Sequence, residues 1–103
     1  MYKITFKLTI ETSKLGQLMD SLPLSMSVKA DIINVTKSKT KVLITRFYWN
    51  INKYPITIKR LNAVCDKFKN QTFKELKGLK PYISDIEIRK ELSLKETLIS
   101  NLK

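Results

Sequence analysis

Hydrophobic and polar residues alternate strictly over residues 2–10. The apolar positions of this stretch are Tyr2, Ile4, Phe6, Leu8 and Ile10. Lysines and threonines stand between them. A period of two in a stretch rich in β-branched and aromatic residues is typical of a β-strand with one buried face. We therefore predict a strand here, with its apolar face in the core.

A short helix is predicted after this strand. Its apolar residues are Leu15, Leu18, Met19 and Leu22. Their spacings of three and four place them on one face of a helix, which can pack against a sheet. Thr12 or Ser13 offers an N-cap for this helix. Pro23 ends it, because proline cannot donate a backbone hydrogen bond.

Two further strands are predicted over residues 27–36 and 42–51. The first contains Val28, Ile32 and Val35, and the second is rich in β-branched and aromatic residues. The polar residues between them have the length of a hairpin connection. The two stretches are therefore expected to pair as neighbouring antiparallel strands.

A second helix is predicted to begin after Thr57, a residue type that favours the N-cap position. Its apolar residues, again at helical spacing, are Ile58, Leu61, Val64, Cys65 and Phe68. The capping-box sequence Thr-Phe-Lys-Glu at 72–75 predicts a separate start for one or two more turns. Gly78 suits the residue just after the end of those turns.

The last predicted elements are a strand over residues 82–89 and a C-terminal helix. Ile86 and Ile88 of the strand are expected to face the core, and the charged residues between them to face outward. A third capping box at 93–96 opens the helix.

The predicted order of elements is β-α-β-β-α-β followed by one more helix. This is the order of the ferredoxin-like, or split βαβ, α+β fold, in which a four-stranded antiparallel sheet carries two helices on one face. The length of 103 residues suits a single domain, 1–103. Residues 1–90 form the expected βαββαβ core, and 91–103 the C-terminal helix. The other sheet face is expected to be open unless that helix or a partner covers it.

The charge of the chain is concentrated in its middle. The net charge is +11, from 20 basic and nine acidic residues. Residues 37–80 contain 12 basic and two acidic residues, a net charge of +10, so the rest of the chain is nearly neutral. A Lys-rich composition that only serves solubility would spread its charge more evenly. The concentration favours an acidic partner, with nucleic acid as the first candidate.

The residue types exclude several kinds of catalytic site. With no histidine and one cysteine, the chain cannot form a Ser-His-Asp triad, a Cys/His zinc site or an internal disulfide. A metal-dependent nuclease built from Asp31, Asp85 and Glu87 is a catalytic alternative, although solvated strand charges are the simpler interpretation. We expect no enzymatic activity, no cofactor and no metal site. Cys65 lies on the apolar side of its helix and is expected in the core.

No apolar run approaches the roughly 18 residues that a membrane span needs. The start of the chain also lacks the apolar region of a signal peptide. Together with the single cysteine, these features predict a cytoplasmic protein.

Basic residues with hydroxyl groups between them form one candidate binding segment. Lys37, Lys39 and Lys41 lie in the predicted hairpin connection, where their charges suit contacts to backbone phosphates. A solvated turn is the alternative interpretation of this segment.

The third predicted strand combines a cation with aromatic residues. Alternation divides it into two faces, and the more apolar set, assigned to the core, is Leu43, Phe47, Trp49 and Ile51. Arg46 and Tyr48 are therefore expected on the open face, where they would stack on bases. An RNA-recognition domain would have a glycine beside these aromatics. Residues 46–49 lack one, so membership of that family is not inferred.

The second predicted helix adds further candidate phosphate contacts. They are Lys59, Arg60, Lys67 and Lys69, followed in the chain by Lys74, Lys77 and Lys80. An alternative interpretation joins this helix to the short one at 72–77 as a helix-turn-helix. The second piece is short for a recognition helix, because it has only about one and a half turns.

These features predict a non-enzymatic module that binds DNA or RNA. The alternative is a protein-interaction module, or an inhibitor or regulator, that docks its basic surface on an acidic protein. The Lys-, Ile- and Asn-rich composition is compatible with a viral or mobile-element origin. Both hypotheses permit homodimerisation through the open sheet face or the C-terminal helix.

Overall fold

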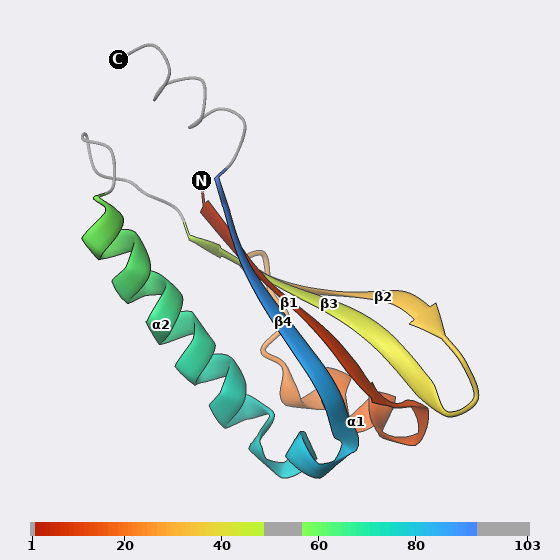
Figure 1. Cartoon of the computed structure of the whole chain (residues 1–103). Coiled ribbons are helices and arrows are strands. Elements are labelled where there is room, and N and C mark those ends of the chain that lie inside the picture. The colour runs from red at the N-terminus through yellow and green to blue at the C-terminus, as the bar shows by residue number, and fades with distance from the viewer. Residues whose placement is uncertain (1, 49–56, 93–103) are drawn as a thin grey trace.

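The structure is a computed structural model that describes residues 2–48 and 57–92 (Figure 1). The elements are β1 (Tyr2–Glu11), the 3₁₀-helix η1 (Thr12–Lys14), α1 (Leu15–Ser21), β2 (Val28–Val35), β3 (Lys39–Tyr48), α2 (Ile58–Glu75), the 3₁₀-helix η2 (Lys77–Tyr82) and β4 (Ile83–Leu92). This order confirms the predicted α+β class. The predicted C-terminal helix at 91–103 is wrong for its first two residues, because β4 extends to Leu92, and its remainder lies outside the described residues, as do Trp49 and Ile51.

The four strands form one antiparallel sheet in the order β2-β3-β1-β4. The long strand β1 is central because its even-numbered residues are apolar and can be covered on one face. Phe6 lies opposite Ile44 of β3 on one side and Ile88 of β4 on the other. Directly opposite residues share a sheet face, so these three side chains belong to the same layer.

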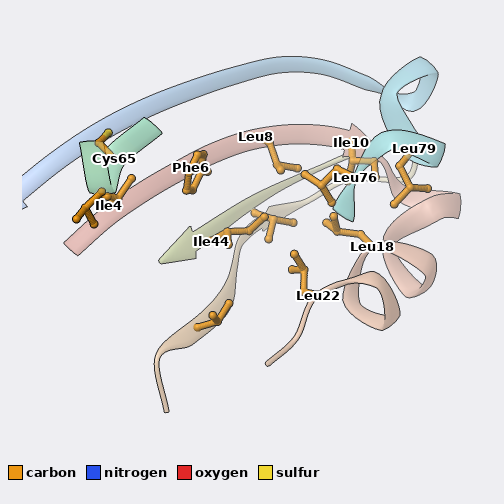
Figure 2. Close-up of a cluster of buried hydrophobic side chains, with 13 residues drawn as sticks. Ile4, Phe6, Leu8, Ile10, Leu18, Leu22, Ile44, Cys65, Leu76 and Leu79 are labelled. Atoms are coloured by element: carbon orange, nitrogen blue, oxygen red, sulfur yellow. The ribbon is translucent and has the colours of Figure 1, made fainter. Parts of the chain in front are cut away.

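The core lies between this sheet face and the helices (Figure 2). Ile4, Phe6, Leu8 and Ile10 of β1 form its floor and are almost fully buried. Side chains from three places cover this face of β1. They are Leu18 of α1 with Leu22 directly after it, Val64 and Cys65 of α2, and Leu76 and Leu79 of the segment after α2. Burial of each such side chain contributes about 1.5–3 kcal/mol, so the even-numbered side chains of β1 anchor the fold. The predicted burial of Cys65 is confirmed.

The predicted assignment of faces in β3 is wrong. Val42 and Ile44 are fully buried against the helices, whereas Leu43 and Phe47 are half-buried on the other face. The pairing with β1 decides this, because the buried even-numbered residues of β1 lie opposite the even-numbered residues of β3. Counting apolar residues could not detect this register, since Arg46 is on the buried face.

Helix α2 is a single helix of 18 residues, so the predicted restart at 72–75 and the helix-turn-helix alternative are both wrong. Thr72 is buried in the middle of the last turns and is not a cap. Gly78 lies within η2 and is not the residue directly after the end of α2, as had been predicted. The start is confirmed, because the side chain of Thr57 accepts a hydrogen bond from the backbone N–H of Arg60.

The first helix starts differently from the prediction. Thr12 belongs to η1 and does not cap α1, and neither helix start has a side-chain cap. The hydroxyl of Thr12 donates instead to the backbone carbonyl of Thr36 at 2.7 Å. It therefore ties the end of β1 to the β2–β3 hairpin rather than beginning a helix.

Candidate nucleic-acid interface

The face of the sheet opposite the helices carries charges of both signs. Lys7 of β1 lies opposite Glu87 of β4, and Lys39 of β3 lies opposite Glu11 of β1. Within β4, the guanidinium of Arg89 donates to the carboxylate of Glu87 at 2.9 Å. This mixture of charges does not make a uniform phosphate-binding surface.

Arg46 is not on the open face, which corrects its predicted position. Its side chain is only 6% exposed and points toward α2. Its Nε donates to the Thr72 hydroxyl at 2.8 Å, and its Nη2 forms a salt bridge with Glu75. These two partners offset the cost of burying the guanidinium, so Arg46 is a structural residue and cannot stack on a base in this conformation.

Tyr48 is also on the helix side of the sheet rather than on the open face. It is half-buried against the core, and its ring centroid lies 6.3 Å from that of Tyr2. The structure places Phe47 on the open face instead, in a position opposite Lys3 of β1. The alternation of the sequence correctly separated the odd-numbered from the even-numbered residues of β3, but the prediction assigned each set to the wrong face of the sheet.

The predicted hairpin lysines are exposed, but only Lys37 is in the turn. Lys39 and Lys41 belong to β3. Thr36 closes the turn, because its hydroxyl donates to the Lys39 carbonyl and accepts from the Lys39 N–H. The three lysines therefore form a small cationic group at the free end of the β2–β3 hairpin (Figure 1).

A larger cationic surface follows the outer side of α2. Lys59, Arg60, Lys67 and Lys74 are exposed, and the helical period places them away from the buried Cys65 and Thr72, with Arg60 and Lys67 beside the buried Val64. Arg60, Lys67 and Lys74 are seven residues apart, which corresponds to about 10 Å between successive members. We call Lys59, Arg60, Lys67 and Lys74 the α2 ridge.

The charge of the α2 ridge is hardly balanced by its own helix. Helix α2 contains two acidic residues, Asp66 and Glu75. Asp66 is exposed, whereas Glu75 turns inward to Arg46. Lys77 and Lys80 of η2 are exposed and extend the positive surface beyond the helix.

The basic central block thus divides into two surfaces. Lys39 and Lys41 share the open face of the sheet with Thr9 and Glu11. The α2 ridge lies on the outer side of a helix that packs on the opposite face. Figure 1 shows the hairpin end and α2 on different sides of the molecule. The predicted site residues are therefore not brought together in one place.

A pocket of about 440 Å³ lies where the end of α2, η2 and the start of β4 meet. Its apolar lining comes from Phe73, Leu76, Ile83 and Ile86. Phe73 is 38% exposed, and Lys69 Nζ lies 5.9 Å from the centroid of its ring. Sequence reasoning missed this pocket because it broke the helix at Thr72. The helical spacing of Phe68, Thr72 and Leu76 was the signal that could have revealed a continuous helix.

The carboxylates of the nuclease alternative are far apart. Asp31 lies on β2 at one edge of the sheet, and Asp85 and Glu87 lie on β4 at the other. Three strand spacings of about 4.8 Å separate the two edges. Among the described residues, no group of three or more acidic or cysteine side chains is placed to hold a metal ion.

No protein-family model, no curated protein and no solved structure matches this chain. Within residues 2–48 and 57–92, no helix is both long and apolar enough to cross a membrane.

Proposed function

We propose that this protein is a non-enzymatic nucleic-acid-binding module of the cytoplasm, built on a ferredoxin-like fold, with the α2 ridge as its main contact surface. The fold proposal is supported by the β-α-β-β-α-β order and by the central position of β1 between β3 and β4. The reducing cytoplasm agrees with a single, buried thiol.

The observation that carries the functional proposal is the charge of α2 and η2. These two elements contain seven basic residues, all exposed, against two acidic residues. One of the two acids, Glu75, is already paired with Arg46. Long, exposed cations along one side of a helix can follow a phosphate backbone, and the release of counterions from the nucleic acid supplies the affinity.

The experiment is a binding titration of labelled single- and double-stranded DNA and RNA over a salt series. If about five phosphates are contacted, affinity for duplex DNA should fall by roughly 10²- to 10³-fold between 50 and 200 mM salt. Absence of salt-sensitive binding to all four ligands would contradict the proposal. Binding to polyglutamate under the same conditions, without binding to nucleic acid, would favour an acidic protein partner instead.

Two triple variants with the same change in charge locate the surface. Lys59→Glu, Lys67→Glu and Lys74→Glu together remove most of the α2 ridge, whereas the matched control replaces Lys37, Lys39 and Lys41 with Glu. We expect the ridge variant to lose at least about 100-fold in affinity and to flatten the salt slope by about 2.7, because three phosphate contacts are lost. The hairpin variant should lose much less. Equal losses would mean that net charge alone decides binding, which would contradict the ridge as the site.

A further inference from the structure

The pocket at the end of α2 lies in the last turns of the helix that carries the α2 ridge, where Phe73 lines it. Lys69 Nζ lies 5.9 Å from the centroid of the Phe73 ring, so a cation of α2 stands beside the pocket. Lys77 and Lys80 line it from η2. A nucleic-acid strand that follows the ridge toward the end of α2 would therefore reach an apolar opening with cations beside it.

The lining combines the two kinds of group that single-stranded nucleic acids require. Phe73 and Ile86 offer apolar surface to the flat face of a base, and Lys77 and Lys80 offer cations to the phosphates on either side of it. Ser84 and Asp85 add polar atoms to the same pocket. A carboxylate there would accept hydrogen bonds from the amino group of a base rather than bind a phosphate.

We infer that this pocket takes one unstacked base of a single-stranded nucleic acid, so that the protein prefers single strands over duplexes. The inference rests on the proposed nucleic-acid function and deepens it. Bases in a duplex are paired and stacked, and their faces cannot enter a pocket without the cost of unstacking. Phosphate contacts along the α2 ridge are common to both kinds of ligand, so the pocket is the part of the site that distinguishes them.

The test compares a 15-nucleotide single strand of mixed sequence with an abasic strand of the same length, as DNA, and repeats the mixed strand as RNA. Both DNA strands carry the same phosphates, so the difference in affinity measures contacts with bases. The wild-type protein should bind the mixed strand about 5- to 150-fold more tightly than the abasic strand. Phe73→Ala should abolish that difference and leave the salt slope unchanged, because it removes no cation.

The controls separate loss of stacking from loss of folding. Phe73→Leu keeps an apolar side chain and should behave like Phe73→Ala, whereas Phe73→Trp should retain the preference for bases. Ile58→Ala removes an exposed apolar side chain at the other end of the same helix and should change nothing. Lys77→Gln with Lys80→Gln should lower the single-strand salt slope by about 1.4 without changing the preference for bases.

Two outcomes overturn the inference in distinguishable ways. If the mixed and abasic strands bind equally and with a steep salt slope, the nucleic-acid function stands and the base pocket is refuted. If neither strand binds at low salt, the proposed function fails and the pocket inference fails with it. A preference for bases that survives Phe73→Ala and Phe73→Leu would place base recognition elsewhere, for instance at Phe47 on the open sheet face.

Discussion

Arg46 links the sheet to α2 because its buried side chain is bound by two residues of that helix. Its guanidinium is buried on the core side of β3, and its partners Thr72 and Glu75 belong to α2. Burial of a charge is costly unless a partner and hydrogen bonds offset it. Glu75 and Thr72 supply both, so the pair joins the sheet to the helix that carries the candidate binding surface.

Removal of one partner should therefore destabilise the fold. We expect Glu75→Ala to lower the free energy of unfolding by about 2–3 kcal/mol, because it leaves the guanidinium buried without its counterion. The loss should be below the roughly 3–5 kcal/mol of fully buried pairs. The reason is that the Glu75 side chain is 23% exposed, so water can partly solvate the site. The measurement is the shift of the urea denaturation midpoint.

An exposed ion pair on the same sheet provides the control. Arg89 and Glu87 are 68% and 49% exposed, and Glu87→Ala should cost no more than about 1 kcal/mol. Replacing both Arg46 and Glu75 with leucine should recover part of the stability that Glu75→Ala loses, because no charge remains buried. Equal small losses for Glu75→Ala and Glu87→Ala would show that the Arg46 pair contributes nothing to the fold.

At the scale of elements, α2 connects the core to the candidate interface. Its inner side contributes Val64, Cys65 and Thr72 to buried positions, and its outer side forms the α2 ridge. The first turn of such a helix has unpaired backbone N–H groups, and Thr57 satisfies one of them at 3.1 Å. The position of Lys59 and Arg60 therefore depends on this cap.

We expect Thr57→Ala to lower the free energy of unfolding by about 1 kcal/mol, because the hydroxyl acceptor is lost. Thr57→Ser retains the hydroxyl and should change stability little. Both variants can be compared by thermal and urea denaturation followed by circular dichroism. Equal effects of the alanine and serine variants would show that the hydroxyl does not cap α2.

At the scale of the whole molecule, the net charge of +11 acts on stability and on binding in opposite directions. Like charges repel within the folded chain, and salt screens this repulsion over a Debye length that shrinks from about 30 Å at 0.01 M to about 3 Å at 1 M. Added salt should therefore raise the melting temperature of the protein. The same salt should weaken the binding of nucleic acid.

Thermal denaturation at 0.02 and 0.5 M sodium chloride, without nucleic acid, measures this effect. Each 1 kcal/mol of repulsion that salt removes should raise the melting temperature by roughly 4–8 °C in a domain of this size. The triple variant in which Lys37, Lys39 and Lys41 become Glu has a lower net charge and should show a smaller rise. A melting temperature that does not rise with salt would mean that the charges are too far apart to destabilise the fold.

Local patterns in the sequence predicted the four strands, the presence of the two helices and the sets of residues that share a face. The alternation of β1, the inward Ile86 and Ile88 of β4, the cap at Thr57 and the burial of Cys65 were all predictable, because each depends on neighbours within a few residues. The four-stranded antiparallel sheet followed from the order of those elements.

Only the tertiary structure decided which face of β3 is covered and where the basic block goes. Periodicity shows that Arg46 and Ile44 share a face, but pairing with β1 is what turns that face toward the helices. The partners that make a buried Arg46 tolerable lie 26 and 29 residues away, beyond the reach of any local pattern. The same long-range packing buries Thr72 in the last turns of α2. It also places Lys39 and Lys41 and the α2 ridge on opposite sides of the sheet. The reason is that each basic residue is carried by its own strand or helix, and β3 and α2 have different places in the fold.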